Sequence, residues 1–227
     1  MSAPLLLSPA DHARISAAVH AAEQHSAGEI VTIVTDRSDG YTDIALAWAA
    51  LAAFTALTVL SIFPDFYLGL YDRVMGHWDR AWTPAAVLTL GASFAILKFM
   101  GALLIQLWPP VKWFLIPRHI KAARVRARAI TCFKVGAERR TDGHTGILIY
   151  VSLREHRAEI VADSAIAAQV SPETWGEAMA AMLTHIRAGD LAEGMVAAVG
   201  KVGAVLAEHF PRAENDRNEL PDRLIEV

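Results

Sequence analysis

Residues 44–63 read IALAWAALAAFTALTVLSIF, twenty residues without a single charge. A second apolar run, from Pro84 to Trp108, contains one charged residue, Lys98. An α-helix rises 1.5 Å per residue, so ~20 apolar residues cross the ~30 Å hydrocarbon layer of a bilayer. A helix in the core of a soluble protein is usually shorter and carries polar residues at helical spacing. The two runs therefore predict a transmembrane hairpin over 44–111, with spans at about 44–63 and 84–108.

The composition of the chain fits this interpretation. Its 227 residues are 54% hydrophobic, with a mean hydropathy of +0.31. Removing the hairpin leaves roughly 160 residues, enough for one domain with its own core. The net charge of −3 gives no basic footprint, so no nucleic-acid partner is predicted. Cys132 is the single cysteine, which excludes an intramolecular disulfide, and we expect a half-buried helix residue there rather than a nucleophile.

The charges on either side of the hairpin predict its orientation. The loop 64–83 carries two cations and three acids, whereas a run of cations without an acid follows the second span. These cations are Lys112, Arg118, Lys121, Arg124, Arg126 and Arg128. The positive-inside rule then places both termini in the cytoplasm and the loop outside. The basic run has three interpretations, which are contact with anionic lipid, a nucleic-acid patch and a solvated helix face. Its position directly after a span favours the first.

Lys98 and the aromatic residues of the loop each allow two interpretations. A charge inside a span marks a functional position by default. Neither span contains an acid to pair with Lys98, so snorkelling towards one interface is the favoured alternative. Five aromatic residues between Phe66 and Trp82 fit either an interfacial belt or packing within an ordered loop.

Short patterned segments flank the hairpin. Upstream, Ser8 and Pro9 begin a helix that runs to about His25, Glu29–Thr35 reads as a strand, and a helix beginning at Tyr41 continues into the first span. Downstream, the pattern predicts a helix over 118–135 that continues from the second span, followed by strands over 147–153 and 158–162. Two further helices are predicted, from Ser171 to about 188 and over 191–209. A mobile charged tail is predicted over 212–227.

Neither part makes a complete domain by itself. A sheet with helices on both faces closes only if the two parts combine, so we expect strand 29–35 to share a sheet with 147–153. The predicted fold class is therefore α/β. It is an α/β/α sandwich formed by residues 1–43 and 112–210, with the hairpin inserted and a charged tail over 211–227.

Three stretches carry a family resemblance. They are LSPADHARISAAVHAAEQHSAGEIVTIVTDRSDGYTDIALAWA, CFKVGAERRTDGHTGILIYVSLREHRAEIVADSAIAAQVSPETW and LTHIRAGDLAEGMVAAVGKVGAVLAEHF. Their order resembles the TPM domain family, in particular its bacterial membrane branch, in which two spans split the domain. The resemblance implies an α/β/α sandwich and a multi-pass protein of the bacterial inner membrane. It also implies one of three activities found in the family, which are calcium binding, acid phosphatase activity and assistance to membrane complexes.

Acidic residues at strand ends form the candidate metal site. Asp36, Asp39 and Asp43 follow the first strand, and Asp163 follows the strand 158–162. Ligands of α/β sheets favour strand ends, and carboxylates bind calcium and magnesium, so Asp36, Asp39 and Asp163 are the predicted ligands. Solvated turn residues explain these acids as well. Soluble TPM domains have a glycine-rich turn where this chain has Ala162-Asp163-Ser164-Ala165, which weakens a site carried over from them.

The sequence offers no catalytic motif beyond these acids. It lacks a glycine-rich phosphate loop, a G-x-S-x-G elbow and a zinc-type histidine cluster. Thr141, Asp142 and Thr145 can line a site or simply form a turn before a buried strand. We therefore expect no cofactor and assign no residue to catalysis. We expect an interaction or assembly module for membrane complexes whose partners are the bilayer and another membrane protein. The alternative is a weak acid phosphatase that depends on a divalent metal, calcium or magnesium.

Overall fold

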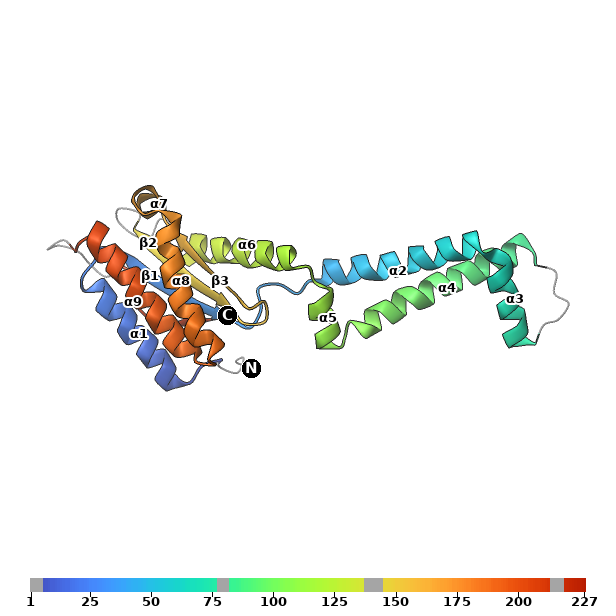
Figure 1. Ribbon diagram of the computed structural model, residues 1–227, viewed down its shortest axis with the longest axis horizontal. Helices are drawn as coiled ribbons and strands as arrows, with labels where there is room; N and C mark the ends of the chain where they lie inside the picture. The colour runs from blue at the N-terminus through green and yellow to red at the C-terminus, as the bar shows by residue number, and fades with distance from the viewer. Residues whose placement is uncertain (1–5, 77–81, 137–144, 213–218) are drawn as a thin grey trace. The chain divides into compact units, whose positions relative to one another are not determined.

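The computed structural model describes residues 6–76, 82–136, 145–212 and 219–227 (Figure 1). It divides the chain into two compact units. Residues 1–39 and 119–227 form what we call the α/β unit, and residues 40–118 form the hairpin unit. Segments on both sides of the hairpin unit thus build one folded body.

A four-stranded sheet with the order β3-β2-β1-β4 organises the α/β unit. Its strands are β1 (Glu29–Thr35), β2 (Gly146–Ser152), β3 (Arg157–Ala162) and β4 (Ile225–Glu226). Strand β1 pairs with β2 in parallel, from Glu29 opposite Gly146 to Thr35 opposite Ser152. This pairing confirms that 29–35 shares a sheet with 147–153. Strand β3 returns antiparallel beside β2, and β4 adds to the other side of β1 in parallel.

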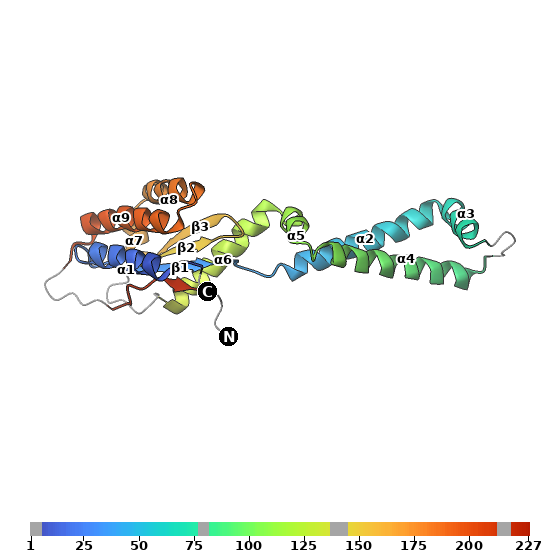
Figure 2. The same cartoon turned by 90° about the horizontal axis from the view of Figure 1, so that it is seen from below.

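Helices cover both faces of the sheet (Figure 2). One face carries α1 (Pro9–Glu23), α7 (Ser164–Gln169), α8 (Pro172–Arg187) and α9 (Leu191–His209), which share a core with the sheet. The other face carries α6 (Arg118–Gly136), whose Val125, Ala129 and Phe133 pack on β1 and β2. Both strands read as continuous apolar runs because helices bury them on both faces. The α/β/α sandwich is thereby confirmed.

Local sequence signals explain where the first of these helices begins and why two others pack closely. Ser8 caps α1, since its Oγ accepts a hydrogen bond from Asp11 N at 3.2 Å and Asp11 Oδ2 accepts one from Ser8 N at 3.3 Å. Gly194 lets α9 approach α8, because a Cβ at this position would lie 2.9 Å from Met182 O. The cap confirms the predicted start of the first helix.

The hairpin unit consists mainly of two helices that run side by side, α2 (Thr42–Ile62) and α4 (Pro84–Ile105) (Figure 1). Both are long and apolar enough to cross a membrane, and only 6% of the most apolar window of each is buried. Near one end Gln106 Nε2 donates a hydrogen bond to Ala45 O at 3.2 Å. Near the other end Gly91 lies against Leu57 and Leu60. The two helices are therefore antiparallel.

Prolines change two expectations in this unit. The expected loop 64–83 contains a helix, α3 (Pro64–Met75), which starts at its proline and ends at Gly76 with φ +73°. The expected continuation of the second span into 118–135 is interrupted. A short helix, α5 (Pro109–Leu115), stands between α4 and α6, because Pro109 and Pro117 each force the preceding residue into extended backbone.

The C-terminal residues also differ from expectation. Residues 219–227, which we call the strap, lie on the α/β unit instead of forming part of a mobile tail. Leu220 and Leu224 are buried in its core, and Ile225 and Glu226 pair with β1 as β4. Charge density suggested a tail, but leucines spaced four apart bury enough apolar surface to hold the segment in place.

Candidate functional site

A hydrogen-bonded polar network lies where the parallel strands β1 and β2 end. Glu155 is buried, and its Oε1 accepts a hydrogen bond from Ser38 N at 3.0 Å while its Oε2 accepts one from Ser152 Oγ. Ser38 Oγ lies 3.0 Å from both Ser152 Oγ and Tyr150 OH. Burial raises the pKa of the Tyr150 phenol, so this group stays protonated and can donate to Ser38.

The predicted ligands Asp36 and Asp39 also lie at this edge, and each is paired with an arginine. Arg154 Nε donates to Asp36 Oδ1 at 2.9 Å and to Oδ2 at 3.0 Å. Arg124 Nε lies 3.2 Å from Asp39 Oδ2. A metal ion that bound these carboxylates would have to displace the guanidinium groups, which carry charge at any physiological pH.

Asp163 lies at the opposite end of the sheet. The preceding residue, Ala162, pairs with Ile147 near the start of β2, because β3 runs antiparallel to it. A seven-residue strand spans ~20 Å, and that length separates the two ends. The structure therefore does not bring Asp163 together with Asp36 and Asp39. Asp163 caps α7 instead, where its Oδ1 accepts a hydrogen bond from Ser164 N at 2.6 Å.

The other residues considered as site candidates do not join this polar network in the described part of the chain. Thr145 Oγ1 donates to Ala27 O at 2.8 Å at the start of β2, while Thr141 and Asp142 lie outside the described residues. Asp43 stands in the first turn of α2, in the hairpin unit. Cys132 is half-buried, as expected, and burial raises the pKa of its thiol. Within residues 6–76, 82–136, 145–212 and 219–227, no three His, Cys, Asp or Glu side chains converge as metal ligands.

A second group of acids, missed by the sequence reasoning, holds the strap. Glu29 accepts hydrogen bonds from the backbone N–H groups of Glu219 at 3.1 Å and Leu220 at 3.2 Å. Glu23 accepts one from Ile30 N at 2.8 Å. The pKa of Glu23 is raised to about 8, chiefly by burial and further by the nearby charges of Glu29 and Asp222, against the lowering effect of the Ile30 hydrogen bond.

Two histidines on α1 also bind the strap. His12 Nε2 lies 2.8 Å from Glu226 Oε1, and His20 Nδ1 lies 2.8 Å from Asp222 Oδ2. The only sequence signal for this arrangement was the i, i+8 spacing of the histidines, which places them on one helix face.

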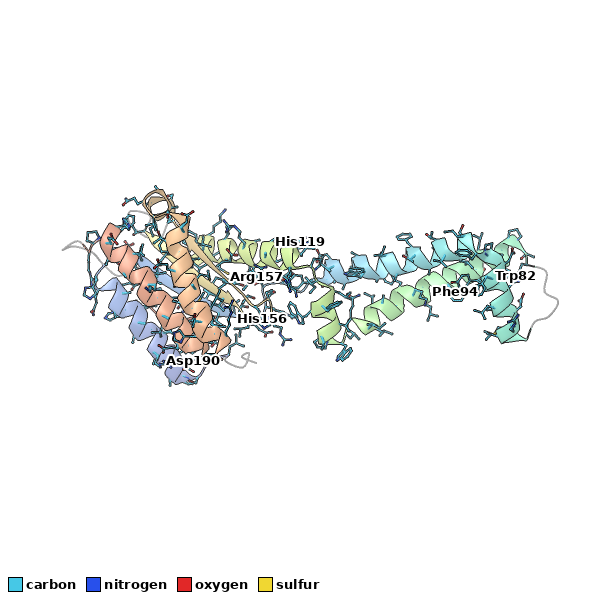
Figure 3. The ribbon with its side chains drawn as sticks, viewed as in Figure 1. Trp82, Phe94, His119, His156, Arg157 and Asp190 are labelled. Carbon is cyan, nitrogen blue, oxygen red and sulfur yellow. The ribbon has the colours of Figure 1, made fainter. Side chains whose placement is uncertain are left out.

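A cavity of about 660 Å³ opens beside the turn between β2 and β3. Its walls include apolar side chains from the turn, α8 and α9, namely Leu153, Leu183, Ile186 and Leu191, and it is bordered by His156, Arg157 and Arg187. Figure 3 labels His156 and Arg157 at the turn. His156 has φ +51°, a left-handed conformation that non-glycine residues seldom adopt and that concentrates at functional positions.

The fold and these sites define a class of protein, namely an α/β sandwich split by a helical hairpin. The polar side chains at its sheet edges form hydrogen bonds and ion pairs within the protein. Residues 115–205 match the family model described as the TPM domain, and this segment covers α6, β2, β3, α7, α8 and most of α9. The chain therefore contains a TPM domain.

One solved structure supports the fold. It is the NMR structure of the BA42 protein from the psychrophilic bacterium Bizionia argentinensis, with a TM-score of 0.57 and 17% sequence identity. The comparison covers 100% of this chain and 99% of that chain. At this level of identity the likeness is one of fold. No curated protein matches the sequence.

Proposed function

We propose that this protein is a multi-pass protein of the bacterial inner membrane, and that its TPM domain is a cytoplasmic interaction or assembly module for membrane complexes. The exposed surface of the hairpin carries this proposal. Phe54, Leu88 and Leu97 are 68%, 73% and 66% exposed, on helices of which only 6% of the apolar window is buried. A core helix of a soluble protein would be mostly covered by its own chain, so a bilayer is the natural cover for this surface.

The chemistry of the polar groups favours binding over catalysis. Asp36 and Asp39 are paired with arginines, and Glu155 accepts hydrogen bonds from Ser38 and Ser152. A catalytic carboxylate must offer the substrate an oxygen lone pair or a proton, whereas these oxygens already accept hydrogen bonds or pair with cations of the protein. A structural role suits this network best, in which its hydrogen bonds hold the loops at this edge of the sheet in place.

The cavity beside the β2–β3 turn is the proposed contact surface on the TPM domain. Its volume of about 660 Å³ and its apolar walls suit the insertion of a partner side chain or short segment. His156 and Arg187 are exposed at its border, so they are suitable positions for a reporter group.

Membrane insertion is tested first. After alkaline carbonate extraction the full-length protein should stay in the membrane pellet. Recovery in the soluble fraction would refute the proposed anchoring.

The interaction role is tested by photo-crosslinking in cells. A photoreactive residue at position 156 or 187 should give one discrete adduct with another membrane protein, whereas the same residue at Lys201, an exposed position of α9, should not. Equal labelling from all three positions would contradict a specific contact. A magnesium- or calcium-dependent phosphatase activity of the purified protein, lost in Asp36→Asn, would establish the alternative function instead.

A further inference from the structure

The hairpin unit carries a cavity of about 550 Å³ between its two long helices. Seven residues of α2 between Trp48 and Leu60 line it, together with Tyr67 of α3 and Phe94 and Lys98 of α4. We call this feature the hairpin groove; Phe94, labelled in Figure 3, marks its α4 side. The α2 residues recur every three to four positions, so they form one helix face about 18 Å long.

Lys98 is the charged residue of this groove, and it lies deep within the hairpin. It stands seven residues after Gly91, which packs on Leu57 and Leu60, and eight residues before Gln106, which bonds Ala45. Each of these contacts is thus ~10 Å from Lys98 along the helix axis. Lysines that snorkel usually lie nearer to a helix end, where the interface is within reach of the side chain.

The two apolar runs supply no counter-charge to Lys98. Residues 44–63 and 84–108 contain no Asp or Glu, so these parts of a second hairpin cannot neutralise Lys98. Among the described residues, Lys98 has neither a hydrogen bond nor an ion pair. Charged side chains within a bilayer are costly, face protein or water, and pair with one another.

We propose that the hairpin groove receives a transmembrane helix of another membrane protein, and that this helix carries a carboxylate at the depth of Lys98. The inference rests on the proposed membrane function and defines the chemistry of the partner. Ala52 and Ala56 line the groove beside larger residues and let a third helix approach α2 closely. The carboxylate selects the partner by charge, since an apolar helix would leave Lys98 uncompensated.

The test uses the full-length protein in phosphatidylcholine vesicles and a synthetic probe. The probe is a fluorescent transmembrane helix of leucine and alanine, about 22 residues long, with one Glu at its centre. A matched probe has Gln at the same position. Energy transfer between the labelled protein and the probe is measured at pH 8. The Glu probe should bind about tenfold more tightly than the Gln probe.

Two variants connect this preference to the groove. Lys98→Met should remove the difference between the Glu and Gln probes. The double variant Leu97→Lys, Lys98→Leu keeps the composition but moves the cation by about 100° around α4, and it should also lose the preference. Retention of the preference in either variant, or equal binding of both probes to the natural sequence, would overturn the proposal.

Two other occupants give different results. If phosphatidylglycerol in the vesicles abolishes binding of the Glu probe while Lys98→Met is insensitive to it, the groove binds an anionic lipid and the proposal is wrong. Self-association of labelled protein that disappears in Lys98→Met would assign the groove to a second copy. Failure of the protein to resist carbonate extraction would instead refute the membrane function itself.

Discussion

Glu23 makes the stability of the α/β unit depend on pH, and Glu23→Gln should remove this dependence. The amide has nearly the shape of the carboxylic acid and stays neutral at every pH. Its oxygen can still accept the hydrogen bond that Glu23 Oε1 accepts from Ile30 N at 2.8 Å. The substitution therefore removes the ionisable group at this position while preserving the contact that orients the start of β1.

The magnitude follows from the pKa of Glu23, which rises from 4.5 to about 8 in the folded chain, chiefly through burial. Below pH 4.5 the carboxyl is protonated in both states and contributes no pH dependence. Between pH 4.5 and 8 the unfolded chain releases the proton and the folded chain retains it, so the free energy of unfolding falls as the pH rises. At 1.36 kcal/mol per pH unit the loss is at most ~5 kcal/mol. Relaxation of the strap around Glu23 should reduce it to about 2–3 kcal/mol.

Thermal unfolding of the purified full-length protein in detergent, followed by near-ultraviolet circular dichroism at pH 5, 6.5 and 8, measures this effect. Natural protein and Glu23→Gln should unfold at similar temperatures at pH 5. At pH 8 the variant should be more stable by about 2–3 kcal/mol, which is roughly 4–12 °C for a protein of this size. Equal slopes of melting temperature against pH for the two proteins would refute the reasoning.

Three further predictions follow from the packing, the candidate acids and the charges around the hairpin. Gly194→Ala should lower the free energy of unfolding by ~1–3 kcal/mol in a denaturant titration, because the new methyl group would lie 2.9 Å from Met182 O. The double variant Asp36→Asn, Asp163→Asn should lower the free energy of unfolding by no more than ~1–2 kcal/mol, because the ion pair between Asp36 and Arg154 is about half exposed and Asn can still cap α7. If calcium or magnesium raises the melting temperature of the natural protein but not of the double variant, the phosphatase function is favoured instead. Reporter fusions should place Gly76 outside the cytoplasm and the C-terminus inside it, and a cytoplasmic signal at Gly76 would reverse the orientation.

The sequence predicted the architecture well wherever local patterns carried the information. The apolar run of β1 lacked a neighbouring strand, which led correctly to its pairing with β2. The residues Ser8, Pro9 and Asp11 indicated the cap of α1 directly. The polarity of segment 64–83 predicted a loop, although its Pro64 and Gly76 are residues typical of the start and the end of a helix, and they begin and end α3.

The candidate site was harder to predict because it depends on strand direction. Grouping Asp163 with Asp36 assumed that both follow strands ending at the same edge, which holds only for parallel strands. Strand β3 is antiparallel to β2, so it ends at the edge of the sheet where β1 and β2 begin. Similarly, the hydrogen bonds of Glu29 to the strap join residues 190 positions apart in the chain, and no spacing rule reaches that far.

The insertion of the hairpin between β1 and β2 also sets the order of events during synthesis. Residues 36–145 separate the two strands, so at 5–20 residues per second the ribosome needs roughly 5–20 s to produce the partner of β1 after β1 itself. During that interval both edges of an apolar strand lack their native neighbours, a situation that promotes aggregation. The proposed insertion of the hairpin into a membrane would hold the nascent strand at the membrane surface throughout this delay. The α/β unit can be completed only on chains whose translation has passed the hairpin, and the pairing of β4 of the strap with β1 comes last.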